Sequence, residues 1–157
     1  MIRPATAADV PLLLRCIREL ARYEKLEHEL DMDGSRLERA MFGPSASVFA
    51  FVAEDGSEPV GFALGFATFS TFKTKLCLHL EDLFVFEPHR GKGHGLRLLR
   101  AVAAEAVRRG ASRLQWNVLD WNAPAIAFYE AQGASLLRDW RICRLDGDAL
   151  AAMASAS

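Results

Sequence analysis

Residues 76–86 read LCLHLEDLFVF, residues 90–95 read RGKGHG, and a periodic apolar segment then continues to Arg109. The first stretch is apolar except for its central residues and predicts one long strand. In the third stretch, Leu98, Leu99, Val102 and Ala106 recur at helical spacing before Gly110, which predicts a helix that ends there. The whole region therefore predicts a strand, a glycine-rich turn and a helix, around which the rest of the chain is organised.

The turn has the composition of an anion site. Gly91, Gly93 and Gly95 leave backbone N–H groups uncovered by side chains at the start of the helix, where the helix dipole is positive. A pyrophosphate suits such a position. The glycine spacing does not fit a dinucleotide fingerprint, because Leu96 stands where a third glycine or alanine is needed, nor does it fit a P-loop.

Composition narrows the class of protein. The chain has 157 residues, 51% of them hydrophobic and 25% charged, which predicts one well-packed domain spanning residues 1–157. The net charge of -1 gives no reason to expect a nucleic-acid or membrane partner. The start of the chain has no signal-peptide pattern. Three widely spaced cysteines predict reduced thiols, and the four histidines do not cluster as metal ligands, so we expect a cytoplasmic protein without a metal.

Strand and helix patterns alternate through the rest of the chain. We expect strands at 1–4, 48–53, 59–69, 113–118, 134–137 and 140–145. We expect helices at 10–23, 35–42, 122–133 and 146–153. Thr6 and Asp9 form a capping box before the first helix, and Asp55-Gly56 marks a hairpin. The order predicts a mixed α/β sheet with helices on both faces.

Several motifs together resemble a known family. Arg-x-x-Gly-x-Gly at residues 90–95, directly after a strand, resembles the acyl-CoA-binding motif of the GNAT acetyltransferases. Four further segments resemble the diamine and polyamine (spermidine/spermine) branch and the related thialysine branch: IRPATAAD at 2–9, ELARYE at 19–24, LEDLFV at 80–85 and WNAPAIAFY at 121–129. Gly133-Ala134 and Trp140 continue the match, which covers almost the whole chain.

The resemblance implies a fold, a co-substrate and a set of site residues. It implies the GNAT fold, a strongly twisted mixed sheet flanked by helices, with acetyl-CoA as co-substrate and a homodimer as the assembly. The implied cofactor-binding residues are Leu83, Phe84, Val85, Arg90, Gly91, Lys92, Gly93, His94, Gly95, Leu96, Asn122 and Tyr129. Leu83 and Val85 would offer backbone groups to the pantetheine arm. Asn122 is also explained as a helix N-cap.

The chemistry needs a base and an acid. An alkylammonium has a pKa near ~10.4, so a group must take its proton before the nitrogen attacks a thioester. Glu81 is our candidate base, because a carboxylate inside an apolar strand is costly unless it is used or paired. By alternation Glu81 shares a face with His79, and Asp82 faces the other way unless a bulge intervenes. The resemblance makes Tyr129 the candidate acid, and the alternative for Tyr129 is a core aromatic.

Glu24, Glu81, Asp82 and Trp140 are the candidate substrate-binding residues. Asp82 resembles the family's amine-binding acid, with a structural hydrogen bond as the alternative. Where the polyamine enzymes carry a tryptophan, this chain has Phe72 with Lys73 and Lys75 beside it, and these two cations would disfavour a polycationic amine unless they point away.

We therefore expect an N-acetyltransferase that moves an acetyl group directly to a primary amine of a small cationic substrate, such as a diamine, a polyamine or a lysine analogue. The open alternatives are acetylation of a peptide or protein amine and a non-catalytic CoA-binding protein of the same fold.

Overall fold

The computed structural model describes residues 1–155. The chain divides into two compact units, the first from Met1 to Asn117 and the second from Val118 onward. The single-domain expectation stays a prediction. No helix among the described residues is long and apolar enough to cross a membrane.

The first unit is built on a five-stranded mixed sheet. Its strands lie in sequence order: β1 (Ile2–Pro4), β2 (Val48–Asp55), β3 (Glu58–Ser70), β4 (Lys75–Val85) and β5 (Leu114–Gln115). Neighbouring strands are antiparallel except for the parallel pair β4–β5. The β5 strand is shorter than the predicted segment 113–118, because only Leu78 and His79 of β4 pair with it.

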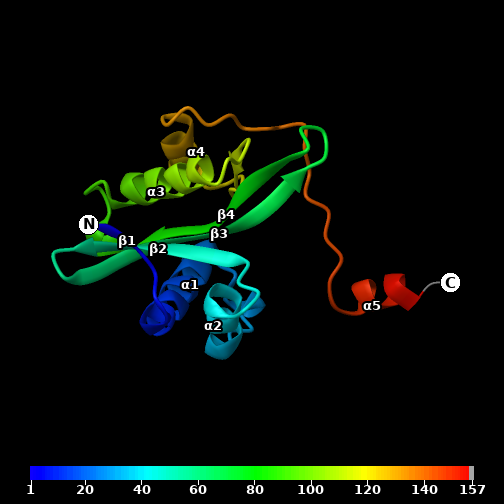
Figure 1. Cartoon of the computed structure of the whole chain (residues 1–157), viewed down its shortest axis with the longest axis horizontal. Coiled ribbons are helices and arrows are strands. Elements are labelled where there is room, and N and C mark those ends of the chain that lie inside the picture. The colour runs from blue at the N-terminus through cyan, green and yellow to red at the C-terminus, as the bar shows by residue number, and fades with distance from the viewer. Residues whose placement is uncertain (156–157) are drawn as a thin grey trace. The chain divides into compact units, whose positions relative to one another are not determined.

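Helices cover both faces of this sheet, as the sequence predicts (Figure 1). On one face lie α1 (Val10–Glu24) and α2 (Gly34–Phe42), and on the other lies α3 (His94–Arg108). Short 3-10 turns occur at Ala7–Asp9, Glu27–Glu29 and Glu87–His89. The main core joins α1 and α2 to the sheet and contains Leu13, Cys16, Met41, Ala50, Val52, Phe62, Leu64 and Phe84. We call the side of the sheet that faces this core the α1 face.

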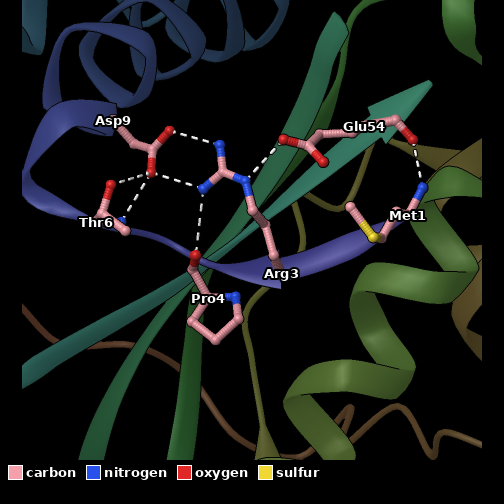
Figure 2. Close-up of polar contacts among 6 residues, drawn as sticks. All are labelled: Met1, Arg3, Pro4, Thr6, Asp9 and Glu54. Carbon is pink, nitrogen blue, oxygen red and sulfur yellow. Dashed lines mark hydrogen bonds and ion pairs between the residues drawn. The ribbon is translucent and has the colours of Figure 1, made fainter. Parts of the chain in front are cut away.

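A network around Arg3 joins β1, β2 and the start of the first helix (Figure 2). The Arg3 Nη1 and Nη2 atoms donate to the two carboxylate oxygens of Asp9, at 2.7 and 2.8 Å, and its Nε donates to Glu54 at 2.7 Å. The N–H and hydroxyl of Thr6 also donate to Asp9, which confirms the predicted pairing of these two residues. Hydrogen bonds from Arg3 hold the pKa of Asp9 well below its usual range.

The second unit contains α4 (Ala123–Glu130) and α5 (Gly147–Ser155). The predicted strand pair at 134–137 and 140–145 is wrong, because these residues form no strand. Trp140 and Ile142 are 75% and 70% exposed, so the alternating apolar residues of this segment do not mark a buried face of a strand. A strand needs a backbone partner as well as a pattern, and an isolated two-stranded ribbon is marginal in water.

Candidate active site

A β-bulge divides β4 at the Leu-Glu-Asp motif. On one side of it Leu80 pairs with Gly65 of β3, and on the other side Asp82 pairs with Leu64. Glu81 is the extra residue and has no partner in the register. A bulge of this kind places two consecutive residues opposite one residue of the partner strand. It therefore changes the alternation of side chains and backbone groups along the rest of β4.

The bulge brings Glu81 and Asp82 to the same face. Directly paired residues share a face, so Asp82 lies with Leu64 on the α1 face. His79 pairs with Phe66 on that face, and their rings stack with centroids 5.2 Å apart. The Glu81 carboxylate lies 3.6 Å from the Nε2 atom of His79, so it belongs to the same face.

A third carboxylate, Glu24 at the end of α1, adds to this group. Burial is the main cause that raises the pKa of Asp82 to about 7, and the negative charges of Glu81 and Glu24 raise it further. Burial also raises the pKa of Glu24. We call Glu24, Glu81 and Asp82 the acidic cluster. Its charge attracts cations, and the sequence predicted all three members as substrate-binding residues.

The same bulge exposes backbone groups on the edge of β4 that faces away from β3. The Leu78 N–H donates outward to the carbonyl of Arg113, whereas the Phe86 N–H donates to Val60 of β3. Backbone groups of successive strand residues point to opposite sides. Because the N–H of Phe86 points to β3, the N–H and C=O groups of Leu83 and Val85 point away from β3. Pairing with β5 stops at His79, so within the first unit this edge is open.

Phe84 differs from Leu83 and Val85, because its backbone groups do not point to the open edge of β4. Its carbonyl faces Gly61 of β3, and its ring lies in the main core. We therefore keep Leu83 and Val85, but not Phe84, as candidates for backbone contacts to a cofactor.

The glycine-rich loop leads directly into α3. Gly91 and Gly93 have φ angles of 75° and 79°, which glycine adopts without strain, and Gly93 is the N-cap residue of the helix. Gly95 is different, because a Cβ atom there would make only an ordinary contact, 3.8 Å from Leu83. The fold therefore needs glycine at the first two positions, whereas at Gly95 the absence of a side chain leaves room for a ligand.

Side chains of the loop already contact protein groups. Arg90 donates from Nε to the carbonyl of Val85 at 2.9 Å, and its guanidinium lies over the ring of Tyr23. Lys92 lies 3.4 Å from Asp55. His94 is buried, with Nδ1 2.9 Å from Arg97, and Leu96 follows it on α3 as a partly buried residue. The loop thus offers an anion mainly its backbone N–H groups and the exposed Lys92.

The remaining predicted residues belong to the second unit. Asn122 caps α4, with its side-chain oxygen accepting from the N–H of Ala125 at 3.3 Å, as the sequence predicts. Tyr129 is buried on α4 beside Phe128. Trp140 lies on the exposed segment between α4 and α5. Their roles in the site stay predictions.

Two features escaped the sequence analysis. The first is the position of the bulge, although Gly65 in the middle of β3 is a signal for one. The contact of Asp55 with the glycine-rich loop was also not anticipated. A cavity of about 270 Å³ lies elsewhere, between the start of β2 and Arg109, and none of the predicted site residues lines it.

Comparison with known proteins identifies the class of enzyme to which this fold belongs. The chain belongs to the acetyltransferase (GNAT) family, which its sequence matches over residues 14–134. It is therefore an N-acetyltransferase, and the mixed sheet flanked by helices is the GNAT fold.

Named relatives are similar along nearly their whole length. The thialysine N-epsilon-acetyltransferase of Bos taurus is 36% identical over 165 residues, covering 98% of this chain and 96% of the relative. The L-ornithine N5-acetyltransferase of Arabidopsis thaliana is 34% identical over 197 residues, covering 97% and 86%. Among solved structures, an integron cassette protein from V. cholerae superposes with a TM-score of 0.80 at 28% identity, covering 99% of this chain and 98% of the other.

Proposed function

We propose that this protein uses acetyl-CoA to acetylate a primary amine of a small cationic substrate, such as a diamine, a polyamine or a lysine analogue like thialysine. The observation that carries the proposal is the bulge in β4. It places the Glu81 and Asp82 carboxylates on the α1 face, near Glu24 of α1, and turns backbone groups of the next residues toward an open strand edge.

The open edge and the glycine-rich loop support the choice of co-substrate. A pantetheine arm carries amide groups, which can pair as an added strand does with the outward backbone groups of Leu83 and the N–H of Val85, whose carbonyl accepts from Arg90. The loop at the start of α3 lies just beyond the end of β4, where its N–H groups suit the pyrophosphate at the far end of that arm. The phosphates and the thioester would then lie at opposite ends of one strand segment.

The acidic cluster supports the choice of acceptor. A primary amine is charged at neutral pH, and it must reach the thioester before losing its proton. Glu24, Glu81 and Asp82 supply negative charge beside the open edge of β4. The named relatives act on thialysine and ornithine, which both carry a primary amine on a short aliphatic chain. Direct transfer to such an amine needs no covalent enzyme intermediate.

The catalytic roles follow from the family resemblance. A carboxylate at the bulge takes the ammonium proton, either directly or through a water, and Tyr129 protonates the departing thiolate. We further propose that the enzyme works as a homodimer in the cytoplasm. Light scattering of the purified protein measures the assembly.

An amine panel tests the proposal. Thiol release from acetyl-CoA would be followed with diamines, polyamines, thialysine, ornithine, lysine and peptide N-termini as acceptors. We expect kcat/KM to be highest for a small amine. Turnover confined to peptide amines would replace the proposed substrate class, and tight CoA binding without any turnover would identify a non-catalytic binding protein.

A further inference from the structure

We propose that Asp82 is the residue that accepts the proton of the substrate ammonium, and that Glu81, held beside His79, binds the cation without taking its proton. The inference rests on the proposed function and assigns a role within the same site. It departs from the sequence-based prediction, which gave the base to Glu81.

The two carboxylates have different surroundings although they are adjacent. The Glu81 side chain is 54% exposed and lies 3.6 Å from the Nε2 atom of His79. Asp82 is partly buried opposite Leu64, and no donor among residues 1–155 makes a hydrogen bond to its carboxylate. The Glu81 carboxylate is thus open to solvent, whereas the less exposed Asp82 carboxylate has no hydrogen-bond donor to offset its burial.

The groups that face Asp82 make its ionisation harder. Glu24 approaches from α1, Glu81 lies next to it on β4, and the paired residue on β3 is the apolar Leu64. Three carboxylates at close range do not all ionise easily, and the proton remains where desolvation is greatest. Burial is accordingly the largest cause that raises the pKa of Asp82 to about 7.

A base of this strength suits the reaction. Transfer from an ammonium with a pKa near ~10.4 to an acceptor near 7 is unfavourable by a factor of roughly 10³, against roughly 10⁶ for an ordinary glutamate near 4.3. The deprotonated form is still well populated at neutral pH, and the proton leaves again readily after each turnover. Catalysis by a positioned base is most efficient when its pKa lies near the working pH.

Asp82 acts at the start of acetyl transfer. One N–H bond of the ammonium breaks and its proton moves to the Asp82 carboxylate. The free electron pair of nitrogen then forms the C–N bond with the thioester carbon, and the C–S bond breaks. Nitrogen loses a second proton as the amide forms, the thiolate gains one, and the proton on Asp82 is released to solvent.

The pH dependence of four variants tests the assignment: Asp82→Asn, Glu81→Gln, Glu24→Gln and the control Glu38→Gln. Glu38 is an exposed residue of α2, so the control removes the same charge away from the site. We expect wild-type kcat/KM to rise with pH through an apparent pKa near 7. Asp82→Asn should lower kcat by about 10²- to 10⁴-fold and recover at high pH, where the amine deprotonates unaided.

The acidic neighbours give an independent readout. Removing the charge of Glu24 lowers the pKa of Asp82, so the acid limb of Glu24→Gln should move to lower pH, whereas that of Glu38→Gln should not. Glu81→Gln should move the limb in the same direction and raise KM for the amine, with kcat within about tenfold of wild type. An acid limb that Glu24→Gln leaves in place overturns the assignment, as does a kcat lost in Glu81→Gln but kept in Asp82→Asn.

A carboxyl NMR titration covers the case in which a variant misfolds. Wild-type protein labelled at aspartate carboxyl carbons should show a resonance that titrates near pH 7 and shifts in Glu24→Gln but not in Glu38→Gln. Absence of any aspartate titrating above pH 5.5 contradicts the inference. Failure of wild-type protein to acetylate any amine contradicts the proposed function instead, so the two failures are distinguishable.

Discussion

Glu81 and Asp82 are consecutive residues of a strand, yet their side chains lie on the same face of the sheet. Regular alternation would have left Glu81 with His79 and turned Asp82 toward α3. The one unpaired residue prevents this, and it also turns the backbone groups of Leu83 and Val85 to the open edge of β4. A single inserted residue therefore sets the positions of both the acidic cluster and the candidate cofactor contacts.

Gly65→Ala should damage this arrangement. A Cβ atom at Gly65 would lie 2.6 Å from the carbonyl oxygen of His79 and 2.9 Å from the ring of Phe49. The backbone contact cannot be relieved by rotating a side chain, so the strands must shift beside the bulge. We expect the free energy of unfolding, measured with urea, to fall by about 1–3 kcal/mol. We also expect kcat/KM to fall under conditions in which the variant is still folded. A folded Gly65→Ala variant with the same kcat/KM as wild type would show that the bulge tolerates the displacement.

Gly95→Ala should have the opposite profile. Its Cβ atom would fit, and alanine in place of glycine within a helix stabilises by about 0.5–1 kcal/mol. The methyl group would nevertheless stand beside the N–H groups that are proposed to bind the pyrophosphate. We expect unchanged or higher thermal stability without ligand and a smaller increase when CoA is added, because that increase follows affinity.

The exposed Ala104 of α3 supplies a control for Gly95→Ala. Ala104→Gly should lower the melting temperature but keep the full increase with CoA. An undiminished CoA effect in Gly95→Ala would remove this residue from the phosphate site.

The sequence predicts features that depend on local chemistry. The glycine-rich loop, the long apolar strand and the helix of Leu98 to Ala106 are each encoded within a few residues, and all are confirmed. Thr6 and Asp9 pair as predicted for the same reason.

Features that depend on a partner strand were predicted less well. The position of the bulge depends on how β3 and β4 align, and the sequence of neither strand alone determines this alignment. The segment around Trp140 and Ile142 has a strand-like pattern, but it has no ladder to join and remains exposed. The site residues of the second unit could be predicted only from the family resemblance.

Tyr129→Phe should separate catalysis from packing. Phenylalanine keeps the ring of this buried residue, so the core packing should be retained, and the change in unfolding free energy reports the hydroxyl alone. Loss of one positioned acid should lower kcat by about 10²- to 10⁴-fold at every pH, with a much smaller change in CoA affinity. The only other tyrosine, Tyr23, provides the control, since Tyr23→Phe removes the same hydroxyl while retaining the ring beside Arg90. Similar kcat values in the two variants would leave Tyr129 as a core aromatic.

Asp9→Asn should make stability less sensitive to acid. The folded-state pKa of Asp9 lies below its unfolded value, so its contribution is complete above about pH 4 and is lost as the pH falls below it. The free energy of unfolding, measured in urea between pH 6 and pH 3, should fall with pH in wild type and fall less steeply in the variant. At pH 6 the variant should be less stable by about 1–3 kcal/mol, because Arg3 loses a charged acceptor. Asp31→Asn, which breaks an exposed pair with Arg36, should cost less stability and change the slope less, because the hydrogen bond that lowers the pKa of Asp31 is exposed to solvent.

Neutralising Lys73 and Lys75 should affect long polyamines more than short amines. Lys75 begins β4 six residues before Glu81, a separation of roughly 20 Å along an extended strand. Charges are screened beyond ~8 Å at physiological ionic strength, so these cations are too distant to repel a short diamine held at the acidic cluster. A long polyamine bound along β4 would approach them.

For the double variant Lys73→Gln/Lys75→Gln we expect KM for a short diamine to stay within about twofold of wild type. KM for a long polyamine should fall, and this fall should shrink as salt is added. Glu24→Gln provides the comparison, because it should raise KM for amines of both lengths. A tenfold or larger drop in KM for the short diamine would place the two lysines at the substrate itself, and the chain would then be expected to select against polycations.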